Sequence, residues 1–226
     1  MNTKHITKSL AAPQKLLWIG LFGLTMGYFE AAVVEYLRRL IYPEGFAFPL
    51  KDIPTMLLAI EFGREIASVV MLFAVGWLAG RNLLDRFAGF MYGFGVWDIT
   101  YYLWLKLFEN WPASLATDDL LFLIPLPWVG PVWAPVLVSV ALIWAAAVYW
   151  RLKDRGTEIS LTRAEWMVEI SAGALIIWSF LWSASEVIQK QPLPAFPWYL
   201  WAVGMASGII IFQFAARRAA RLLLRS

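Results

Sequence analysis

The sequence predicts an all-α integral membrane protein with six transmembrane helices, and three observations lead to this fold class. The 226 residues are 61% hydrophobic and only 15% charged, whereas a soluble domain carries about 25% charged residues. The apolar residues gather in blocks, each near or above the ~20 residues that cross ~30 Å of hydrocarbon as a helix. The basic residues lie mainly between these blocks and in the tails, as expected for a membrane protein.

Six helices are expected in order along the chain, at residues 16–37, 54–80, 87–107, 129–150, 165–187 and 198–215. The first follows a basic tail, "MNTKHITKSLAAPQK", but no small-residue cleavage site closes a short apolar region there. We therefore expect an uncleaved first span and not a signal peptide. No internal repeat or low-complexity linker divides the chain, so residues 1–226 are predicted to form a single membrane domain.

The basic residues predict the topology. If the N-terminus is inside, the inner segments hold thirteen of the nineteen Lys and Arg residues: Lys4, Lys8, Lys15, Arg81, Arg86, Arg151, Lys153, Arg155, Arg163, Arg217, Arg218, Arg221 and Arg225. The outer segments hold five: Arg38, Arg39, Lys51, Lys106 and Lys190. Only Arg64 remains, inside a span. The positive-inside rule then places both termini in the cytoplasm, and it explains the net charge of +3 without a nucleic-acid partner.

Between the third and fourth predicted helices lies an apolar segment rich in Trp and Pro, "ENWPASLATDDLLFLIPLPWVGPVWAP". Its prolines, Pro125, Pro127, Pro131 and Pro135, exclude a long regular helix. We expect an amphipathic or re-entrant segment at the outer interface, which either covers a cavity as a lid or anchors the chain at the membrane surface.

Pairs of glycines four residues apart recur in the predicted helices: Gly76 with Gly80, Gly89 with Gly93, and Gly204 with Gly208. Such pairs lie on one helix face and let two backbones approach closely. Packing within the bundle is the favoured interpretation, ahead of a dedicated dimer interface.

Ionisable residues inside the predicted spans mark a candidate site. Glu61, Arg64 and Glu65 are three and four residues apart and share one side of the second helix. In the third helix, Asp98 lies three and four residues before Tyr101 and Tyr102. Glu30 of the first helix falls at the same depth, between the midplane and the outer surface. Because each charge costs ~2.5–3.5 kcal/mol at a helix centre, these side chains should converge and pair.

The pairing can be predicted in part. Glu61 and Arg64 should pair within their own helix and face Asp98, while Glu65 should turn toward Glu30. Four carboxylates against one guanidinium leave an excess of negative charge. Either some carboxylates hold a proton, or a cation, water or a base from another chain joins them. The cluster is either a ligand, proton or cation site or a structural set of ion pairs that fixes the helix register.

The composition excludes several kinds of chemistry. The chain has no Cys and one His, His5, in the N-terminal tail, so thiolate zinc sites, iron–sulfur clusters, His-bound haem and disulfides are not expected. No phosphate-binding glycine loop, HExxH or GxSxG motif occurs. We predict no cofactor and no metal site, and any acid–base chemistry would fall to the carboxylates and tyrosines.

The stretch "GVWDITYYLWLKLFENWPASLATDDLLFLIPLPWVGPVWAPV", together with "YFEAAVVEYLRR" and "IEFGRE", resembles a family of uncharacterised bacterial multi-pass inner-membrane proteins. The resemblance covers residues 27–136 and implies a location in a bacterial inner membrane, but no activity. By analogy alone, the embedded carboxylates with Trp are also similar to those of sterol-isomerase-like four-helix membrane proteins.

Three functional hypotheses follow. In the first, a pocket open to the outer face binds or translocates a small cationic or amphiphilic ligand or protons, with the acids as acceptors, Arg64 orienting them and the two tyrosines donating hydrogen bonds. In the second, the chain is an accessory or structural subunit of a larger complex or a homo-oligomer, and carries no redox centre. In the third, it is an enzyme that acts on a lipid or isoprenoid by carboxylate acid–base chemistry.

Overall fold

The computed structural model describes residues 10–223, so the expectations for Lys4, His5, Lys8 and Arg225 lie outside the described residues. The chain is all-α apart from one small sheet. The helices are α1 (Ala12–Ile41), α2 (Thr55–Ala79), α3 (Leu83–Glu109), α4 (Trp133–Asp154), α5 (Arg163–Leu181), α6 (Ala184–Ile188) and α7 (Trp198–Leu223). A long helix therefore covers most of each predicted apolar block.

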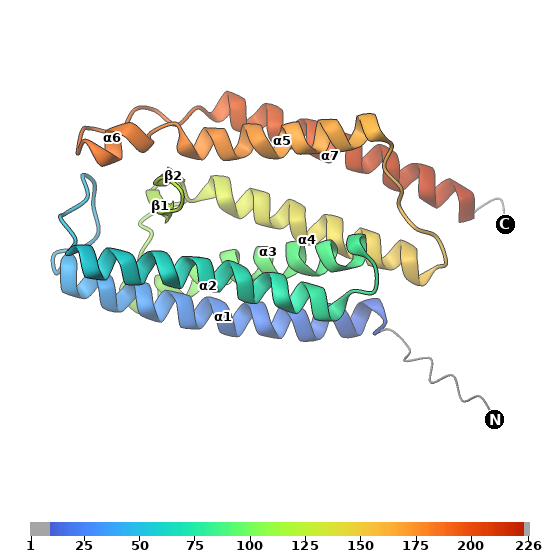
Figure 1. The fold of residues 1–226 in the computed structure, drawn as a ribbon, viewed down its shortest axis with the longest axis horizontal. Coiled ribbons are helices and arrows are strands. Elements are labelled where there is room, and N and C mark those ends of the chain that lie inside the picture. The colour runs from blue at the N-terminus through green and yellow to red at the C-terminus, as the bar shows by residue number, and fades with distance from the viewer. Residues whose placement is uncertain (1–9, 224–226) are drawn as a thin grey trace.

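Within residues 10–223, four helical segments are long and apolar enough to cross a membrane: α1, α4, Arg163–Ile188 (α5 and α6 together) and α7. This indicates a membrane-embedded protein. α2 and α3 are 25 and 27 residues long and run beside α1 in the same bundle (Figure 1). They carry the ionisable residues that the sequence singled out.

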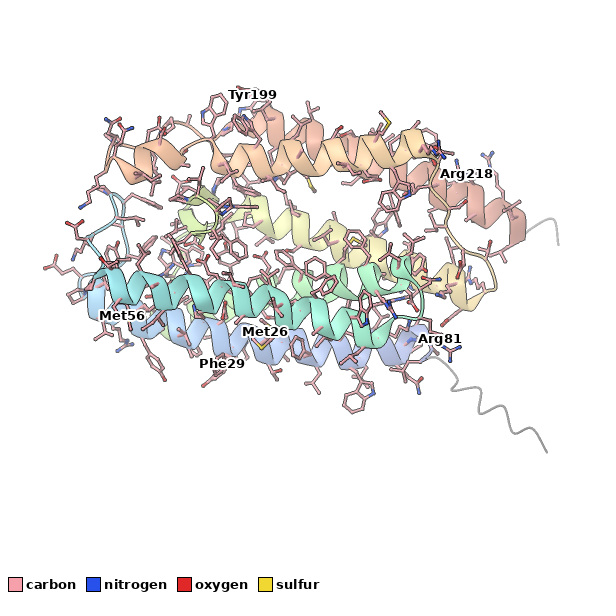
Figure 2. All side chains as sticks on the ribbon, in the orientation of Figure 1. Met26, Phe29, Met56, Arg81, Tyr199 and Arg218 are labelled. Carbon is pink, nitrogen blue, oxygen red and sulfur yellow. The ribbon has the colours of Figure 1, made fainter. Side chains whose placement is uncertain are left out.

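The long helices run side by side along the long axis of the molecule (Figure 1). α3 is central, because it packs against α1, α2 and α4, whereas α5 packs mainly against α7. The start of α1 and the end of α7 lie at the same end of the bundle, and α6 and the sheet lie at the other (Figure 1). Figure 2 shows Arg81 and Arg218 at the end where α1 starts, and Met56 at the opposite end.

Side-chain caps fix two of the helix starts. The Asn82 side chain accepts a hydrogen bond from the backbone N–H of Asp85, 2.9 Å away, at the start of α3. Thr162 and Glu165 form a reciprocal capping box at the start of α5. Both devices satisfy backbone N–H groups that have no partner inside the helix.

Glycines allow α2 and α3 to touch backbone to backbone. A Cβ at Gly76 would lie 2.5 Å from the backbone nitrogen of Phe90, and a Cβ at Gly89 would lie 2.9 Å from the Cα of Gly76. The third predicted pair behaves alike, because a Cβ at Gly204 would meet the carbonyl oxygen of Ala172 on α5 at 2.8 Å. The glycine pairs therefore face helices of the same chain, as the packing interpretation requires.

The Trp/Pro-rich segment forms an antiparallel hairpin of β1 (Asp118–Phe122) and β2 (Trp128–Pro131). The predicted fourth helix is therefore wrong at its start, since residues 129–131 belong to the strand and α4 begins at Trp133. The hairpin also reaches into the bundle: the Phe122 and Trp97 ring centroids are 6.1 Å apart. Trp97 lies twelve residues before the end of α3, or about 18 Å along the helix. A strand at such depth is tolerated because protein surrounds it.

We expect Gly76→Ala to lower the free energy of unfolding by about 1–3 kcal/mol, because the new methyl group must push two backbones apart. Gly63→Ala is the matched control on the same helix, since a Cβ there meets no atom within 4 Å. That control should be neutral or stabilising by up to about 1 kcal/mol. Unfolding in detergent measures both, and equal stability of the two variants would contradict the close approach of α2 and α3.

Candidate functional site

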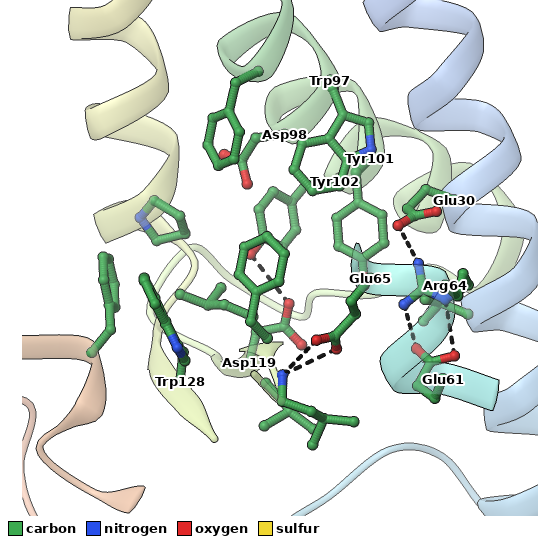
Figure 3. A pocket seen from close by; sticks show the side chains of 18 of the residues that line it. Glu30, Glu61, Arg64, Glu65, Trp97, Asp98, Tyr101, Tyr102, Asp119 and Trp128 are labelled. Carbon is green, nitrogen blue, oxygen red and sulfur yellow. Dashed lines mark hydrogen bonds and ion pairs between the residues drawn. The ribbon is translucent and has the colours of Figure 1, made fainter. Parts of the chain in front are cut away.

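A cavity of about 380 Å³ lies among α1, α2, α3, α4, α5, the hairpin and the loop before α2. Its volume falls within the ~300–1,000 Å³ that is usual for small-molecule sites. All seven residues that the sequence singled out line it: Glu30, Glu61, Arg64, Glu65, Asp98, Tyr101 and Tyr102. Figure 3 shows these residues together with Asp119. We call this part of the wall, with Asp119 and Arg38, the polar end of the cavity.

Arg64 joins α1 to α2 at the polar end. Its Nε donates to Glu61 at 2.9 Å and its Nη2 to the other Glu61 oxygen, as the sequence predicts, while its Nη1 donates to Glu30 (Figure 3). Ser68 also donates to Glu30, at 2.9 Å. The planar guanidinium can serve two carboxylates at once because its donors are fixed in a fork. The Arg64 side chain is only 18% exposed, so it faces protein and not the outer surface.

Glu65 does not turn toward Glu30, so that part of the prediction is wrong. Both oxygens of Glu65 accept from the backbone N–H of Leu123, at 3.0 and 2.9 Å, just after β1. The sequence could not predict this contact. The Trp/Pro-rich segment was expected to lie at the membrane interface, and no strand was predicted whose end could reach Glu65. The carboxylate instead satisfies a backbone donor that the hairpin carries into the bundle.

Asp98 lies on the α4 side of the cavity, away from Arg64 (Figure 3). The prediction that the Glu61–Arg64 pair faces Asp98 is therefore wrong, because the free side of the guanidinium turns to Glu30 of α1. Its carboxylate accepts from the Ser139 hydroxyl at 2.8 Å. Tyr102 donates to Asp119 of β1 at 3.2 Å, and Tyr101 packs edge to face on Tyr102 with ring centroids 5.1 Å apart. The expected cluster of Asp98 with both tyrosines therefore becomes two separate contacts, one to α4 and one to the hairpin.

Sequence reasoning missed a second guanidinium, Arg38, which it assigned to an outer loop. α1 continues to Ile41, so Arg38 lies on the helix and is 6% exposed. It donates to Glu109 at 2.5 Å and to Asp119 at 3.1 Å, and it stacks over the Trp111 ring at 3.8 Å. The run "EYLRR" was the available signal, because Arg38 lies eight residues after Glu30 and so close to the same helix face.

Sequence reasoning also missed Asp85, at the opposite end of α3. This carboxylate is fully buried and accepts from Lys15 at 2.5 Å and from the Trp150 indole at 2.8 Å, with Lys153 at 3.3 Å. It ties α1, α3 and α4 together away from the cavity. Since the lysines satisfy its charge, we interpret it as a structural contact.

The acids of the polar end differ in their cationic partners. Glu30 and Glu61 pair with Arg64, and Asp119 pairs with Arg38. Among the described residues, no ion pair joins a cation to Glu65 or to Asp98, which make only the neutral hydrogen bonds given above. Both are at most 9% exposed. The cavity wall therefore holds two buried acids that a cation could neutralise.

Two indoles of the wall also lack partners. Trp97 and Trp128 line the cavity, and neither buried indole N–H has an acceptor in the part of the chain that the structure describes. Buried donors are nearly always satisfied in native proteins, so these two indoles are exceptions within the cavity wall. The described residues include no group of three or more His, Cys, Asp or Glu that could hold a metal ion.

No family model matches this sequence, and no curated protein or solved structure is significantly similar to it. The function is therefore argued from the geometry of the cavity.

We expect Arg64→Leu to lower the free energy of unfolding by about 3 kcal/mol, because it leaves two buried carboxylates without their cation. Adding Glu61→Leu should recover part of this lost stability. The rest should remain lost, because Glu30 still lacks its cation and keeps only the hydrogen bond from Ser68. A double-mutant cycle in detergent measures the coupling. A double variant no more stable than Arg64→Leu would show that the pair is not what stabilises this part of α2.

Asp119 gives the hairpin a pH dependence. Burial raises the pKa of Asp119 to about 6, although Arg38 and the Tyr102 hydroxyl act to lower it. The folded state therefore holds a proton that the unfolded state releases above its usual pKa of about 3.9. The contribution of Asp119 to the free energy of unfolding therefore increases by on the order of 2 kcal/mol as the pH falls from about 6 to about 4.

Asp119→Asn should remove this rise, whereas Asp118→Asn, at the exposed neighbouring position, should keep most of it. Chemical unfolding between pH 4 and pH 7 gives the slope for each variant. An unchanged slope in Asp119→Asn would contradict the burial of this carboxylate.

Proposed function

We propose that this chain is a six-helix inner-membrane protein whose cavity binds a small cationic or amphiphilic ligand. In this proposal α1, α2, α3, α4, α5 with α6, and α7 all cross the bilayer, and both termini lie in the cytoplasm. The bilayer is its immediate partner, and nucleic acid is not.

The distribution of basic residues supports this orientation. Arg81, Arg155 and Arg218 lie at or near the end of the bundle where α1 starts and α7 ends, which the positive-inside rule assigns to the cytoplasm. The polar end of the cavity lies toward the opposite end, near the hairpin and the loop before α2. In this orientation the carboxylates that would bind a ligand lie in the outer half of the membrane.

The observation that carries the proposal is the pair of buried acids, Glu65 and Asp98, which have no cationic partner in the described chain yet share one cavity wall. An uncompensated carboxylate is costly in such surroundings, so a ligand cation would gain strongly from binding between them. Trp97 and Trp128 add aromatic rings to the same wall, and aromatic rings bind quaternary ammonium groups. Protons could occupy the same acids when no ligand is bound.

Binding of tetramethylammonium to the protein in lipid nanodiscs tests the proposal. This probe is a quaternary ammonium cation without a hydrocarbon chain, so its binding reports on the cation site alone. We expect Asp98→Asn and Glu65→Gln each to weaken binding by about tenfold, which is the loss of about 1.4 kcal/mol of charge attraction. Glu44→Gln is the matched control, since Glu44 is exposed and does not line the cavity.

Equal binding by all three variants would contradict the proposal, as would the absence of any binding to the unmodified protein. Thermal unfolding of each variant shows whether a loss of binding reflects a loss of fold.

A further inference from the structure

We infer that the ligand is a single-chain amphiphile, with a cationic head between Glu65 and Asp98 and a hydrocarbon chain that lies along α3. This inference rests on the proposed function and adds the chemical class of the ligand and the route by which it arrives.

The cavity continues from its polar end into an apolar arm, which we define by Phe87, Phe90, Met91, Phe94 and Leu142. Phe87 and Tyr101 both line the cavity and lie fourteen residues apart on α3, or about 21 Å along the helix. A volume of about 380 Å³ extended over that length is long and narrow. Such a shape fits one extended chain better than a compact or branched ligand.

The apolar arm is open at its side. Phe87 is 46% exposed and Ile177 of α5 is 42% exposed, although both line the cavity. Among the described residues α5 packs mainly on α7 and the hairpin, and it shares few close backbone contacts with α3. In a bilayer this side would face hydrocarbon, so a chain could slide in from the lipid without crossing water.

The polar end, in contrast, is covered. Tyr42, Phe46, Leu50 and Ile53 of the loop before α2 line the cavity there. The guanidinium of Arg38 lies 4.5 Å from the Phe46 ring. Asp52 of the same loop pairs with Lys190 after α6 at 2.5 Å. A ligand with a long chain therefore has its open route through the side of the arm, with the head moving up to the carboxylates.

Charge selects the head group. Glu65 and Asp98 favour a cation. The two carboxylates of Glu30 and Glu61 also carry one more negative charge than Arg64 can neutralise. An anionic head would face five carboxylates with two guanidinium groups, both of which are already paired. A cationic amphiphile is therefore favoured over a fatty acid or an alkyl phosphate, which like charges would repel.

The test compares dodecyltrimethylammonium with tetramethylammonium and with dodecyl sulfate, each measured as binding in excess of protein-free nanodiscs. Leu142→Trp fills the apolar arm, and Leu137→Trp is the matched control, because Leu137 is an exposed residue of α4 outside the cavity. We expect Leu142→Trp to weaken dodecyltrimethylammonium binding at least tenfold and to leave tetramethylammonium binding unchanged. Leu137→Trp should change neither, and dodecyl sulfate should not bind.

Ile177→Trp gives a second variant, at the open side and on the half-exposed surface, in case Leu142→Trp does not fold. It should slow the association of dodecyltrimethylammonium at least tenfold without slowing that of tetramethylammonium. If Asp98→Asn weakens binding of both cations about tenfold while both Trp variants bind the dodecyl probe normally, the proposed position of the hydrocarbon chain is wrong and the proposed cation site is supported. If neither cation binds the unmodified protein, both proposals fall.

Discussion

The guanidinium of Arg64 is the interaction on which the polar half of this bundle depends. It lies among apolar helices, where an unpaired cation would be too costly to retain. By donating to Glu61 on its own helix and to Glu30 on α1, it neutralises part of an acidic wall and fixes α2 against α1. α1 and α2 otherwise share few contacts, because both pack mainly on α3. The ion pairs thus set the position of the α2 face that borders the cavity.

The hairpin is the second constraint, and it is coupled to the first. β1 carries Asp119 to Arg38 and Tyr102, and the backbone N–H of Leu123 to Glu65. Backbone polar groups at this depth need partners from the protein, which explains why a buried carboxylate meets a strand end. The polar end of the cavity is therefore closed by hydrogen bonds, whereas its apolar arm is lined by rings and aliphatic side chains.

The sequence predicted the helices and the candidate residues because both can be recognised from residues that are close together in the chain. Apolar blocks near membrane length correspond to the long helices, and three-residue spacing alone pairs Glu61 with Arg64. The partners of Glu65, Asp98 and Tyr102 are Leu123, Ser139 and Asp119, which lie 58, 41 and 17 residues away. No periodicity links such positions, and the prolines that correctly excluded a helix between α3 and α4 did not indicate a hairpin. Arg38 and Asp85 were missed because they lie near helix ends. The apolar pattern does not fix where a helix ends, so both residues were assigned to loops.

The most direct test of this account is the position of the Arg64 side chain in a side-chain-resolution map of the protein in lipid nanodiscs. The account predicts that Arg64 lies between Glu30 and Glu61, facing the cavity, with the residue 118–131 hairpin inserted beside Glu65. A map with Arg64 directed at lipid, or with the hairpin flat on the membrane surface and Glu65 free of it, would contradict the account.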